Sequence, residues 1–331
     1  MSDALLDRYG AVLLDLDGTV YHGSRPIPGA VEAVSAARER GVAVRYVTNN
    51  ASKSPDDVAG TLTGMGLPAE ATEVRTSSQA AGRLLAQRLP AGATVLVVGA
   101  RALEDEVLAA GLRPVREAGE DVTAVVQGHS PDTGWVDLAE ACLAVRAGAL
   151  WVAANVDATL PAERGLLPGN GSMVAALRTA TDSEPLVAGK PAPPLFHAAA
   201  ADTGVPLVVG DRLDTDIAGG IAAGYDTLVV LTGVATPASV LAAVPGERAH
   251  YIAADLGALG ATVAELAVGP QPGWDVAASG GTLTVSGDGG PDDDPLALLR
   301  ALCSVGWRDG TTTVRPSGDA AAAALDRLGL G

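Results

Sequence analysis

The chain has 331 residues, a length that predicts about two domains, and its 48% hydrophobic and 3% aromatic residues predict a core built from alanine, valine and leucine. With 39 acidic and 22 basic residues the formal net charge is −17, which argues against nucleic acid or an anionic membrane as a partner. The sequence has neither an apolar stretch of the roughly 18 residues that a transmembrane span needs nor a signal-peptide pattern, so we expect a cytoplasmic protein.

The first predicted strand, residues 11–16, is an apolar run that ends in acidic residues. Asp15 and Asp17 stand two positions apart, and Gly18 and Thr19 then break the strand. A continuous apolar run is typical of a buried parallel strand, and ligands bind beyond the carboxyl ends of such strands. Because burial of unpaired carboxylates is costly, a bound metal cation would account for this pair. An acidic strand end that faces solvent is the alternative.

A helix is predicted over 28–40 and a second strand over 42–47, and this strand also ends in polar residues. Thr48, Asn49 and Asn50 offer hydroxyl and amide groups, which hydrogen-bond phosphoryl oxygens well together with backbone N–H groups. A turn that caps the following helix is the alternative. The alternation of strands and helices predicts a parallel sheet.

Helices and strands continue to alternate in the middle of the chain. The predicted helices are 55–66, 76–89, 102–110 and 135–146, and the predicted strands are 94–98, 122–126 and 151–154. Because polar motifs lie on both sides of this series, we expect residues 82–185 to form an inserted cap domain with its own α/β structure. We expect Trp135 to lie in the core of this cap.

Lysine is rare in this chain, since only Lys53 and Lys190 occur, and Lys190 stands between Gly189 and Pro191. If Pro191 is the first residue of a helix, Lys190 lies at the helix N-terminus, where a cation opposes the helix dipole. This placement favours a bound anion near Lys190. An ordinary loop lysine is the alternative.

A further strand over 206–210 runs into Asp211, and Asp214 and Asp216 follow before the next helix. Asp211 is well placed as a ligand for a hard cation. Asp216 would orient Lys190 or a water molecule bound to the metal. N-capping of the helix by Asp214 or Asp216 is the alternative.

Beyond a Pro/Gly-rich break at 269–273, the chain continues with a C-terminal extension, residues 274–331. A hairpin is predicted at 274–277 and 282–286, helices from 291–295 onward and over 319–328, and a strand over 311–315. These elements predict a small module of ββαβα or βββα order, which buries too little core to be stable alone and should dock on the rest of the chain or on a partner subunit. Cys142 and Cys303 lie in apolar, helix-like stretches, so we expect buried structural thiols.

Four segments of this chain resemble the signature motifs of the haloacid dehalogenase superfamily. In chain order these segments are Asp15-Leu16-Asp17-Gly18-Thr19, Thr48-Asn49, Lys190, and Gly210-Asp211 with Asp216. The acid at Asp17, two positions after the family's nucleophile, implies a phosphatase or phosphotransferase. The implied α/β fold is a Rossmann-like parallel-sheet core of residues 1–81 and 186–268, an inserted α/β C2 cap of residues 82–185, and the small α+β extension.

The resemblance implies that Asp15 attacks phosphorus and forms an aspartyl-phosphate. Asp17 would protonate the leaving oxygen and then deprotonate the hydrolytic water. The cofactor Mg²⁺ would be held by the Asp15 carboxylate, the Asp17 backbone carbonyl and Asp211. Asp216 would lie behind these ligands and orient Lys190 or a water molecule bound to the metal.

The cap resembles that of the NagD-like phosphatases, and residues 151–180 are most similar to the actinobacterial glycerol-3-phosphate phosphatases. The implied substrate-binding residues are Thr48, Asn49, Asn50 and Lys190 for the phosphoryl group, and Asn155, Asp157, Asn170 and His129 for the leaving group. Turn chemistry is the alternative for Asn155 and Asp157, and a solvated loop histidine is the alternative for His129. The chain departs from the NagD-like pattern at Ala154, where threonine is usual.

The first hypothesis is therefore Mg²⁺-dependent hydrolysis of glycerol 3-phosphate, because a small diol needs hydrogen-bonding side chains in the cap rather than an aromatic wall. Phosphoglycolate or nitrophenyl phosphate, hydrolysed by the same chemistry, is the alternative. A catalytically idle binding or regulatory protein is the alternative from another class. The expected partner is a small phosphorylated metabolite, and a homodimer is left open.

Overall fold

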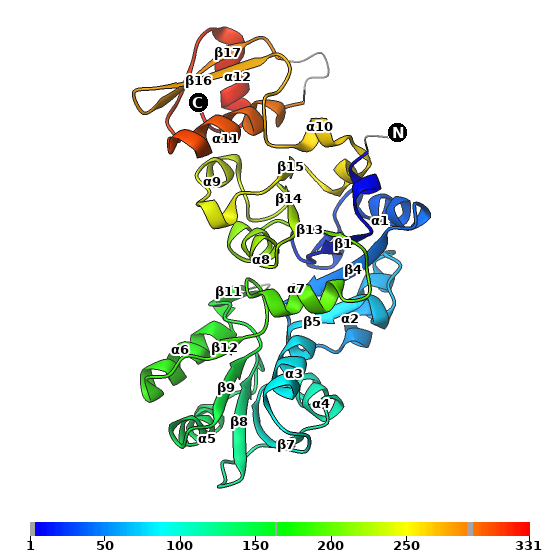
Figure 1. Ribbon diagram of the computed structural model, residues 1–331, viewed down its shortest axis with the longest axis vertical. Helices are drawn as coiled ribbons and strands as arrows, with labels where there is room; N and C mark the ends of the chain where they lie inside the picture. Colours follow the sequence, from blue (N-terminus) through cyan, green and yellow to red (C-terminus); the bar gives the residue numbers. More distant parts are fainter. Residues whose placement is uncertain (1–3, 163, 290–293) are drawn as a thin grey trace. The chain divides into compact units, whose positions relative to one another are not determined.

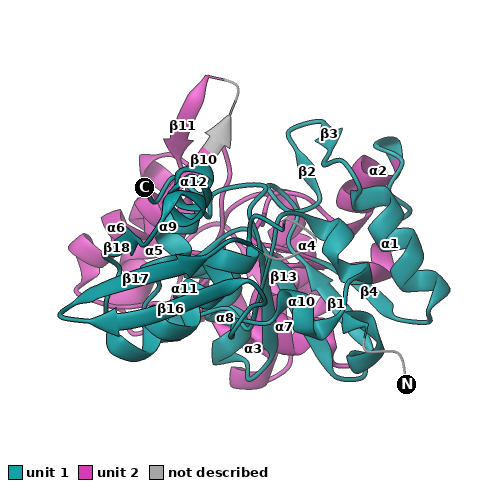
Figure 2. Ribbon diagram, turned by 90° about the horizontal axis from the view of Figure 1, so that it is seen from above, with its two compact units in different colours: residues 1–46, 64–68, 202–331 teal, residues 47–63, 69–201 magenta. Residues whose placement is uncertain are grey.

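The computed structural model of the protein describes residues 4–162, 164–289 and 294–331. It divides into two compact units, which Figure 2 distinguishes by colour. Unit 1 comprises residues 1–46, 64–68 and 202–331, and unit 2 comprises residues 47–63 and 69–201. The predicted core and cap boundaries near residues 82 and 185 mark where a segment is inserted in the sequence, whereas the two units are defined by which residues pack together. These boundaries stay a prediction.

Unit 1 is built on a parallel sheet with the strand order β15-β14-β13-β1-β4 (Figure 1). Its strands are β1 (Ala11–Leu14), β4 (Ala43–Thr48), β13 (Pro206–Gly210), β14 (Asp226–Val230) and β15 (Tyr251–Ala253). Every residue of β1 and β13 is buried, as expected for central strands with both faces covered. The predicted strands and the parallel α/β class are confirmed, although β1 ends at Leu14 rather than at residue 16.

Helices and turns connect these strands. The helices of unit 1 are α1 (Ala30–Glu39), α8 (Ala218–Ala222), α9 (Pro237–Leu241), α10 (Val263–Leu266), α11 (Ala297–Asp309) and α12 (Asp319–Arg327). The 3₁₀ turns are η1 (Leu5–Arg8), η4 (Pro245–Glu247) and η5 (Leu256–Gly260), and η3 (Leu213–Ile217) is a π-helical turn that runs into α8. Two short strands after β1, β2 (Tyr21–His22) and β3 (Arg25–Pro26), pair as an antiparallel hairpin.

The C-terminal module has the order ββαβα around the three-stranded sheet β16-β17-β18. Its strands are β16 (Trp274–Ser279), β17 (Thr282–Gly287) and β18 (Val314–Pro316), with α11 between β17 and β18 and α12 at the end. The ββαβα alternative is therefore confirmed. The predicted helix start at Pro291, Asp292 and Asp293 lies outside the described residues.

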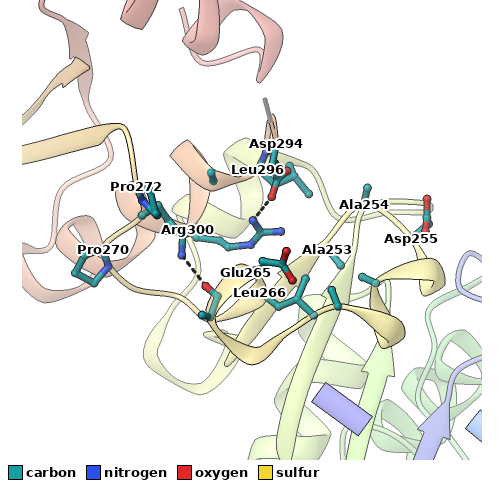
Figure 3. Close-up of a pocket in the computed structure, with 15 residues that line it drawn as sticks. Ala253, Ala254, Asp255, Glu265, Leu266, Pro270, Pro272, Asp294, Leu296 and Arg300 are labelled. Atoms are coloured by element: carbon teal, nitrogen blue, oxygen red, sulfur yellow. Dashed lines mark hydrogen bonds and ion pairs between the residues drawn. The ribbon is translucent and has the colours of Figure 1, made fainter. Parts of the chain in front are cut away.

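The module shares a hydrophobic core with the parallel sheet of unit 1. Leu299 of α11 belongs to the same buried cluster as Val240 of α9 and Ile252 of β15. Arg300 is only 2% exposed, and its Nε donates a hydrogen bond to the Ile252 carbonyl at 2.8 Å. Its guanidinium also forms an ion pair with Asp294 (Figure 3). The expectation that the module docks on the rest of the chain is confirmed.

A cavity of about 670 Å³ lies beside Arg300, with walls made mainly of alanine and proline (Figure 3). Its acidic residues are Asp255, Glu265 and Asp294. Each of these carboxylates accepts a hydrogen bond from a nearby backbone N–H group at 2.7–2.9 Å. The charged groups of the cavity are thus accounted for by the ends of local helices and turns.

Unit 2 contains a second parallel sheet with the order β12-β9-β8-β6-β7. The strands of this unit are β5 (Val74–Thr76), β6 (Thr94–Val98), β7 (Arg113–Val115), β8 (Val122–Gln127), β9 (Leu150–Ala153), β12 (Leu186–Val187) and the hairpin of β10 (Thr159–Ala162) with β11 (Gly165–Pro168). Its helices are α2 (Pro55–Gly64), α3 (Ser77–Arg88), α4 (Arg101–Ala109), α5 (Trp135–Arg146), α6 (Asn170–Thr181) and α7 (Pro193–Ala200), with the 3₁₀ turn η2 (Ala71–Glu73) before β5. The predicted series of alternating strands and helices is confirmed.

Two expectations about burial need correction. Trp135 is 81% exposed rather than buried, because α5 turns the face with Ala141, Ala144 and Val145 inward and Trp135, its first residue, lies outside that face. Cys142 is only partly buried, whereas Cys303 is buried and its burial raises the pKa of the thiol to about 12. Among the described residues, no helix has both the length and the apolar character needed to cross a membrane.

Candidate active site

The register of two neighbouring strands brings Asp15 and Asp211 to the same edge of the sheet. β1 and β13 run parallel, with Leu14 opposite Val209, and the Asp15 N–H donates to the Val209 carbonyl at 2.9 Å. Asp15 follows β1 directly, and Asp211 follows β13 directly. Both carboxylates therefore stand beyond the carboxyl ends of central strands, where parallel α/β sheets bind their ligands.

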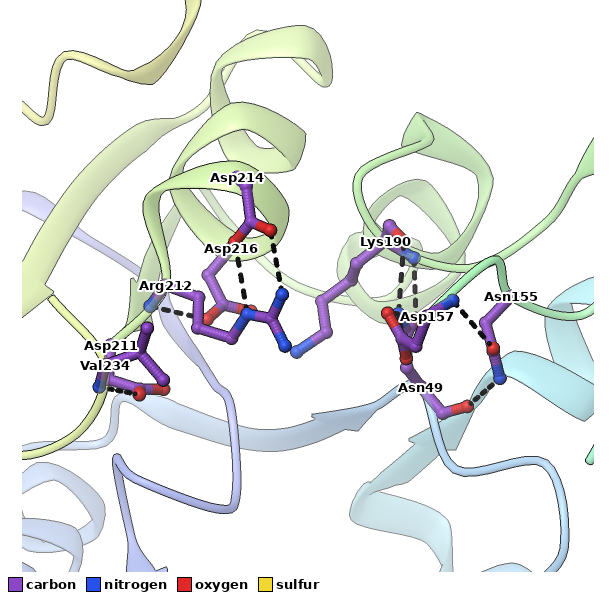
Figure 4. Close-up of polar contacts among 9 residues, drawn as sticks. All are labelled: Asn49, Asn155, Asp157, Lys190, Asp211, Arg212, Asp214, Asp216 and Val234. Carbon is purple, nitrogen blue, oxygen red and sulfur yellow. Dashed lines mark hydrogen bonds and ion pairs between the residues drawn. The ribbon is translucent and has the colours of Figure 1, made fainter. Parts of the chain in front are cut away.

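Asp216 completes a cluster of three carboxylates. One oxygen each from Asp15, Asp211 and Asp216 lies within 4.8 Å of the others, and the two later residues are only 1% exposed. The η3 turn returns Asp216 to this point, where its Oδ2 accepts a hydrogen bond from the Arg212 N–H at 3.1 Å (Figure 4). Hard carboxylate oxygens at this spacing fit Mg²⁺ or a similar divalent cation. Asp216 thus lies among the candidate ligands themselves.

The backbone at two glycines lies close against the Asp211 carboxylate. A Cβ atom at Gly18 would lie 2.4 Å from its Oδ2, and one at Gly233 would lie 2.0 Å away, so neither position has room for a side chain. The Val234 N–H donates to the same Oδ2 at 2.7 Å (Figure 4), and the Thr19 hydroxyl donates to Oδ1 at 3.4 Å. These contacts fix the direction in which Asp211 presents its oxygens.

Asp17 occupies a more open position than Asp15. Its side chain is 55% exposed, and its Oδ1 lies 4.0 Å from Nδ1 of His22 on β2. The Gly18 N–H donates to the Tyr21 carbonyl at 2.8 Å. Because this N–H and the Asp17 carbonyl belong to one planar peptide group, the hydrogen bond also sets the direction of that carbonyl. An exposed carboxylate beside a fixed carbonyl is compatible with the proton-transfer role predicted for Asp17.

Unit 2 contains a second polar network, centred on Asn49. The Asn49 side-chain amide donates to both oxygens of Asp157 at 3.1 and 3.2 Å and to the Lys190 carbonyl at 3.1 Å. Its Oδ1 accepts from the Lys190 N–H at 2.7 Å (Figure 4). A Cβ at Gly189 would lie 2.5 Å from this Oδ1, which explains the glycine before Lys190. Asn49 therefore joins the second and third motifs and Asp157.

The amides predicted to bind the leaving group extend this network. Asn155 Nδ2 donates to the Asn49 carbonyl at 2.7 Å, and its Oδ1 accepts from the Asp157 N–H at 3.2 Å (Figure 4). Asn170, at the start of α6, donates from Nδ2 to the Asn155 carbonyl at 2.6 Å. Both asparagines are buried. They connect loops of unit 2, and their contact with a substrate stays a prediction.

The remaining predicted residues have simpler surroundings. Thr48 Oγ1 accepts from the Asn50 N–H at 3.1 Å, and Asn50 Oδ1 accepts from the Ser52 N–H at 2.8 Å. Lys190 is 4% exposed, with Nζ 3.4 Å from the Val47 carbonyl. His129 is partly exposed, and no hydrogen bond joins its ring to the part of the chain that is described.

The predicted helix start at Pro191 is wrong. Helix α7 begins at Pro193, because Ala192 before it is held in an extended conformation, as residues before proline usually are. Lys190 therefore precedes the helix by three residues, and the argument from the helix dipole for a nearby anion does not apply. The backbone contacts with Asn49 position Lys190 instead.

Comparison with known families agrees with this arrangement. The profile of the haloacid dehalogenase-like hydrolases matches residues 12–113, and that of the HAD-hydrolase-like family matches residues 187–259. A third profile, of the GCN5-related N-acetyltransferase like domain, matches residues 271–330 and thus covers the C-terminal module.

Similar proteins extend over nearly the whole chain. A D-glycerol 3-phosphate phosphatase of Mycobacterium tuberculosis is 53% identical over 311 residues, which are 92% of this chain and 87% of that protein. The crystal structure of a glycerol phosphate phosphatase of the same organism in complex with magnesium has a TM-score of 0.95 at 52% identity and covers 99% of both chains. A 4-nitrophenylphosphatase of Thermotoga maritima has a TM-score of 0.71 at 29% identity, over 78% of this chain and 99% of that one. With its carboxylates at the ends of adjacent parallel strands, the chain belongs to the haloacid dehalogenase-like hydrolases.

Proposed function

We propose that this protein is a Mg²⁺-dependent phosphatase that hydrolyses glycerol 3-phosphate to glycerol and inorganic phosphate. The observation that carries the proposal is the cluster of Asp15, Asp211 and Asp216. Asp15 follows β1, Asp211 follows β13, and Asp216 lies in the η3 turn after Asp211. The extensive identity with a D-glycerol 3-phosphate phosphatase supports the choice of substrate. Glycerol 3-phosphate is a small polar molecule, and the loops of unit 2 carry amide side chains that can form hydrogen bonds with its hydroxyl groups.

In the first half of the proposed reaction, a carboxylate oxygen of Asp15 attacks phosphorus and the bond to the ester oxygen breaks. Asp17 donates its proton to that oxygen, so glycerol leaves as a neutral alcohol. In the second half, Asp17 takes a proton from water as the water oxygen attacks phosphorus. Inorganic phosphate then leaves, and Asp15 returns as a carboxylate.

The metal and the phosphoryl-binding groups have separate parts in this proposal. The Asp15 and Asp211 carboxylates and the Asp17 carbonyl would hold Mg²⁺, with Asp216 beside them; bound Mg²⁺ supplies positive charge that lowers the repulsion between the carboxylate nucleophile and the anionic ester. The Thr48 hydroxyl, the Asn49 backbone and Lys190 would bind the phosphoryl oxygens. These roles rest on the match of the residues to the family motifs.

Asn49 illustrates how the phosphoryl-binding loop is prepared. Its side chain is already bound to Asp157 and Lys190, and its carbonyl accepts from Asn155. The Asn49 backbone N–H is therefore the group we assign to the phosphoryl group. Asn50, whose side chain binds Ser52, would act mainly by shaping this turn.

A nitrophenyl phosphatase of broad specificity is the second candidate, favoured by the structural likeness to a 4-nitrophenylphosphatase. A phosphoglycolate phosphatase differs because its substrate carries a carboxylate, for which a basic residue in the cap loops would be needed. A homodimer is compatible with either function and stays a prediction.

The test is phosphate release from a panel of esters, measured with Mg²⁺ and with EDTA. The panel contains glycerol 3-phosphate, phosphoglycolate, nitrophenyl phosphate, a sugar phosphate and a nucleotide. Asp15→Asn should lower the rate by at least about 10³-fold, because amide nitrogen or oxygen is a poor nucleophile. Asp202→Asn, at an exposed loop carboxylate, is the matched control and should keep full activity.

The panel separates the candidates. Preference for glycerol 3-phosphate that is lost in Asp15→Asn supports the proposal. Equal rates on all esters favour the broad phosphatase, and preference for another ester removes the substrate assignment while keeping the mechanism. Absence of Mg²⁺-dependent release from every ester would favour an idle binding protein.

A further inference from the structure

The loop that follows β14, residues 232–235, contacts several parts of the proposed metal site, although none of the four family motifs includes it. Its Val234 N–H and Ala235 N–H donate to the Asp211 side chain and carbonyl, at 2.7 and 2.8 Å. Its Gly233 has no room for a side chain beside Asp211. The loop therefore meets the fourth motif through backbone atoms.

Thr232 connects the same loop to the first motif. Its Oγ1 donates to the Gly18 carbonyl at 2.6 Å, a short hydrogen bond between residues 214 positions apart in the chain. Its own carbonyl lies 2.6 Å from His22 Nε2, on the β2–β3 hairpin. A single residue thus joins the turn after Asp17, the hairpin and the loop that holds Asp211.

The Thr232 hydroxyl is one of two hydrogen-bond partners that hold the turn at Gly18. The Gly18 N–H is bound to the Tyr21 carbonyl, and the Gly18 carbonyl is bound to Thr232. These two hydrogen bonds hold the peptide groups on either side of the Gly18 Cα. One of these peptide groups carries the Asp17 carbonyl, the predicted metal ligand.

We propose that Thr232 is a positioning residue, whose hydroxyl fixes the turn that carries the Asp17 carbonyl relative to Asp211 and thereby sets the affinity of the site for Mg²⁺. This inference rests on the proposed function, since it takes the acidic cluster to be the Mg²⁺ site. Thr232 itself touches neither the substrate nor the metal. Its effect passes through Gly18.

Two substitutions separate the hydroxyl from the shape of the side chain. Thr232→Val keeps the branched shape and removes the donor, so the dissociation constant of Mg²⁺ should rise about tenfold, the size expected for a well-formed hydrogen bond. Thr232→Ser keeps the donor and should stay within about twofold of the parent. The readout is Mg²⁺ titration by calorimetry without substrate, followed by the dependence of kcat and KM on Mg²⁺.

Thr236→Val is the matched control. Thr236 lies directly after the 232–235 loop as the N-cap residue of α9, and its hydroxyl accepts a hydrogen bond from the Ser239 N–H. This variant should weaken the helix end and leave Mg²⁺ affinity unchanged.

In Thr232→Val, kcat at saturating Mg²⁺ should fall less than kcat at limiting Mg²⁺, and KM for the ester should stay constant.

Several results would overturn the inference. They are parent-like Mg²⁺ affinity in Thr232→Val, an equally large loss in Thr232→Ser, or an equal loss in Thr236→Val. If Thr232→Val does not fold, Thr232→Ser still decides, because a tenfold loss with the donor retained contradicts the assigned role. A parent protein that binds Mg²⁺ but hydrolyses no ester would remove the proposed function and leave this calorimetric test intact.

Discussion

At the residue scale, the geometry of the acidic cluster depends on glycine at two positions beside Asp211, Gly18 and Gly233. A Cβ at Gly233 would lie 2.0 Å from Asp211 Oδ2, so Gly233→Ala must displace that carboxylate or the loop. A displacement of about 1 Å at a reacting centre costs on the order of 10²-fold in rate. We therefore expect phosphate release by Gly233→Ala to fall by this order, with a higher Mg²⁺ requirement.

The control for this prediction is Gly246→Ala. A Cβ at Gly246 has no atom within 4 Å among the described residues, so this variant should keep both rate and Mg²⁺ dependence. Equal activity of the two variants would mean that the Asp211 carboxylate tolerates displacement. It would also weaken the assignment of Asp211 as a metal ligand.

The residues of the candidate site differ in how well the sequence could predict them. Asp15 and Asp211 follow apolar runs, and an acid at the end of a buried strand is visible without a structure. Val234 contributes a backbone N–H to Asp211, and its side chain gives no sign of this contact. Gly233 is the available signal, because it follows the apolar run 228–231, and a strand that pairs with β13 in parallel ends at the same sheet edge.

Two loop residues of unit 2, Asn155 and Asp157, illustrate a different difficulty. Amides and acids between strands, as at Asn155 and Asp157, indicate either turns or ligand contacts. The structure gives both of them hydrogen bonds to Asn49, more than 100 positions away in the chain. A partner so distant in sequence cannot be inferred from local spacing, because only the folded sheet brings the loops together.

At the scale of elements, Tyr9 connects the N-terminal η1 turn to two strands of unit 1. Its hydroxyl donates to Asp226 Oδ2 on β14 at 2.6 Å, and its oxygen lies 2.9 Å from the Tyr251 hydroxyl on β15. Tyr9→Phe leaves the partners without this hydrogen bond. We expect the free energy of unfolding near neutral pH to fall by about 1–2 kcal/mol in urea denaturation.

The same contact predicts the behaviour of the protein in alkali. Burial, together with the hydrogen bonds to Asp226 and Tyr251, raises the pKa of Tyr9 above its ordinary value of 10.0. The folded protein therefore keeps this proton at pH values where the unfolded chain releases it, so stability is lost as the pH rises above about 10. Tyr9→Phe should show a shallower alkaline loss, and an identical pH dependence of both proteins would contradict this assignment.

Elements with a clear apolar pattern could be predicted, whereas two short hairpins could not. Strand β6 and helix α5 have the predicted bounds, since an apolar run of five residues and a twelve-residue helical pattern are clear signals. The hairpins β2–β3 and β10–β11 consist of strands of two and four residues, and they lack the continuous apolar run that predicts the equally short strand β1. Their pairing depends on the turns between them rather than on an apolar pattern.

At the scale of the whole molecule, the C-terminal module depends on the core on which it docks. Its match to a GCN5-related N-acetyltransferase like profile covers only residues 271–330, and its buried residues form one cluster with α9 and β15. A chain of this size buries only about 60% of the surface that its unfolded form exposes, so we expect the module alone to be marginally stable. Removal of the module should likewise leave buried core residues such as Val240 and Ile252 facing water.

This dependence predicts that the module and the core of unit 1 unfold together. Leu299 on α11 is fully buried in the shared cluster, so Leu299→Ala should lower the free energy of unfolding by about 2–5 kcal/mol. Ile252→Val should lower the free energy of unfolding by about 1 kcal/mol. In calorimetry both variants should lower the midpoint of the same transition. Leu108→Ala is the control, because Leu108 is 50% exposed and the same truncation there should change stability little.

Truncation after Gly269 removes the whole C-terminal module. Because the shortened chain exposes the apolar side of α9 and β15, we expect a lower thermal midpoint and self-association in size-exclusion chromatography. If the truncated protein instead keeps the assembly state and the stability of the full chain, the shared cluster contributes nothing to unit 1. Unchanged kinetics in that stable form would further mean that the module has no influence on catalysis. The Leu299→Ala variant could instead lower the midpoint of one calorimetric transition and leave a second transition unchanged. That result would mean that the module unfolds independently of the rest of unit 1.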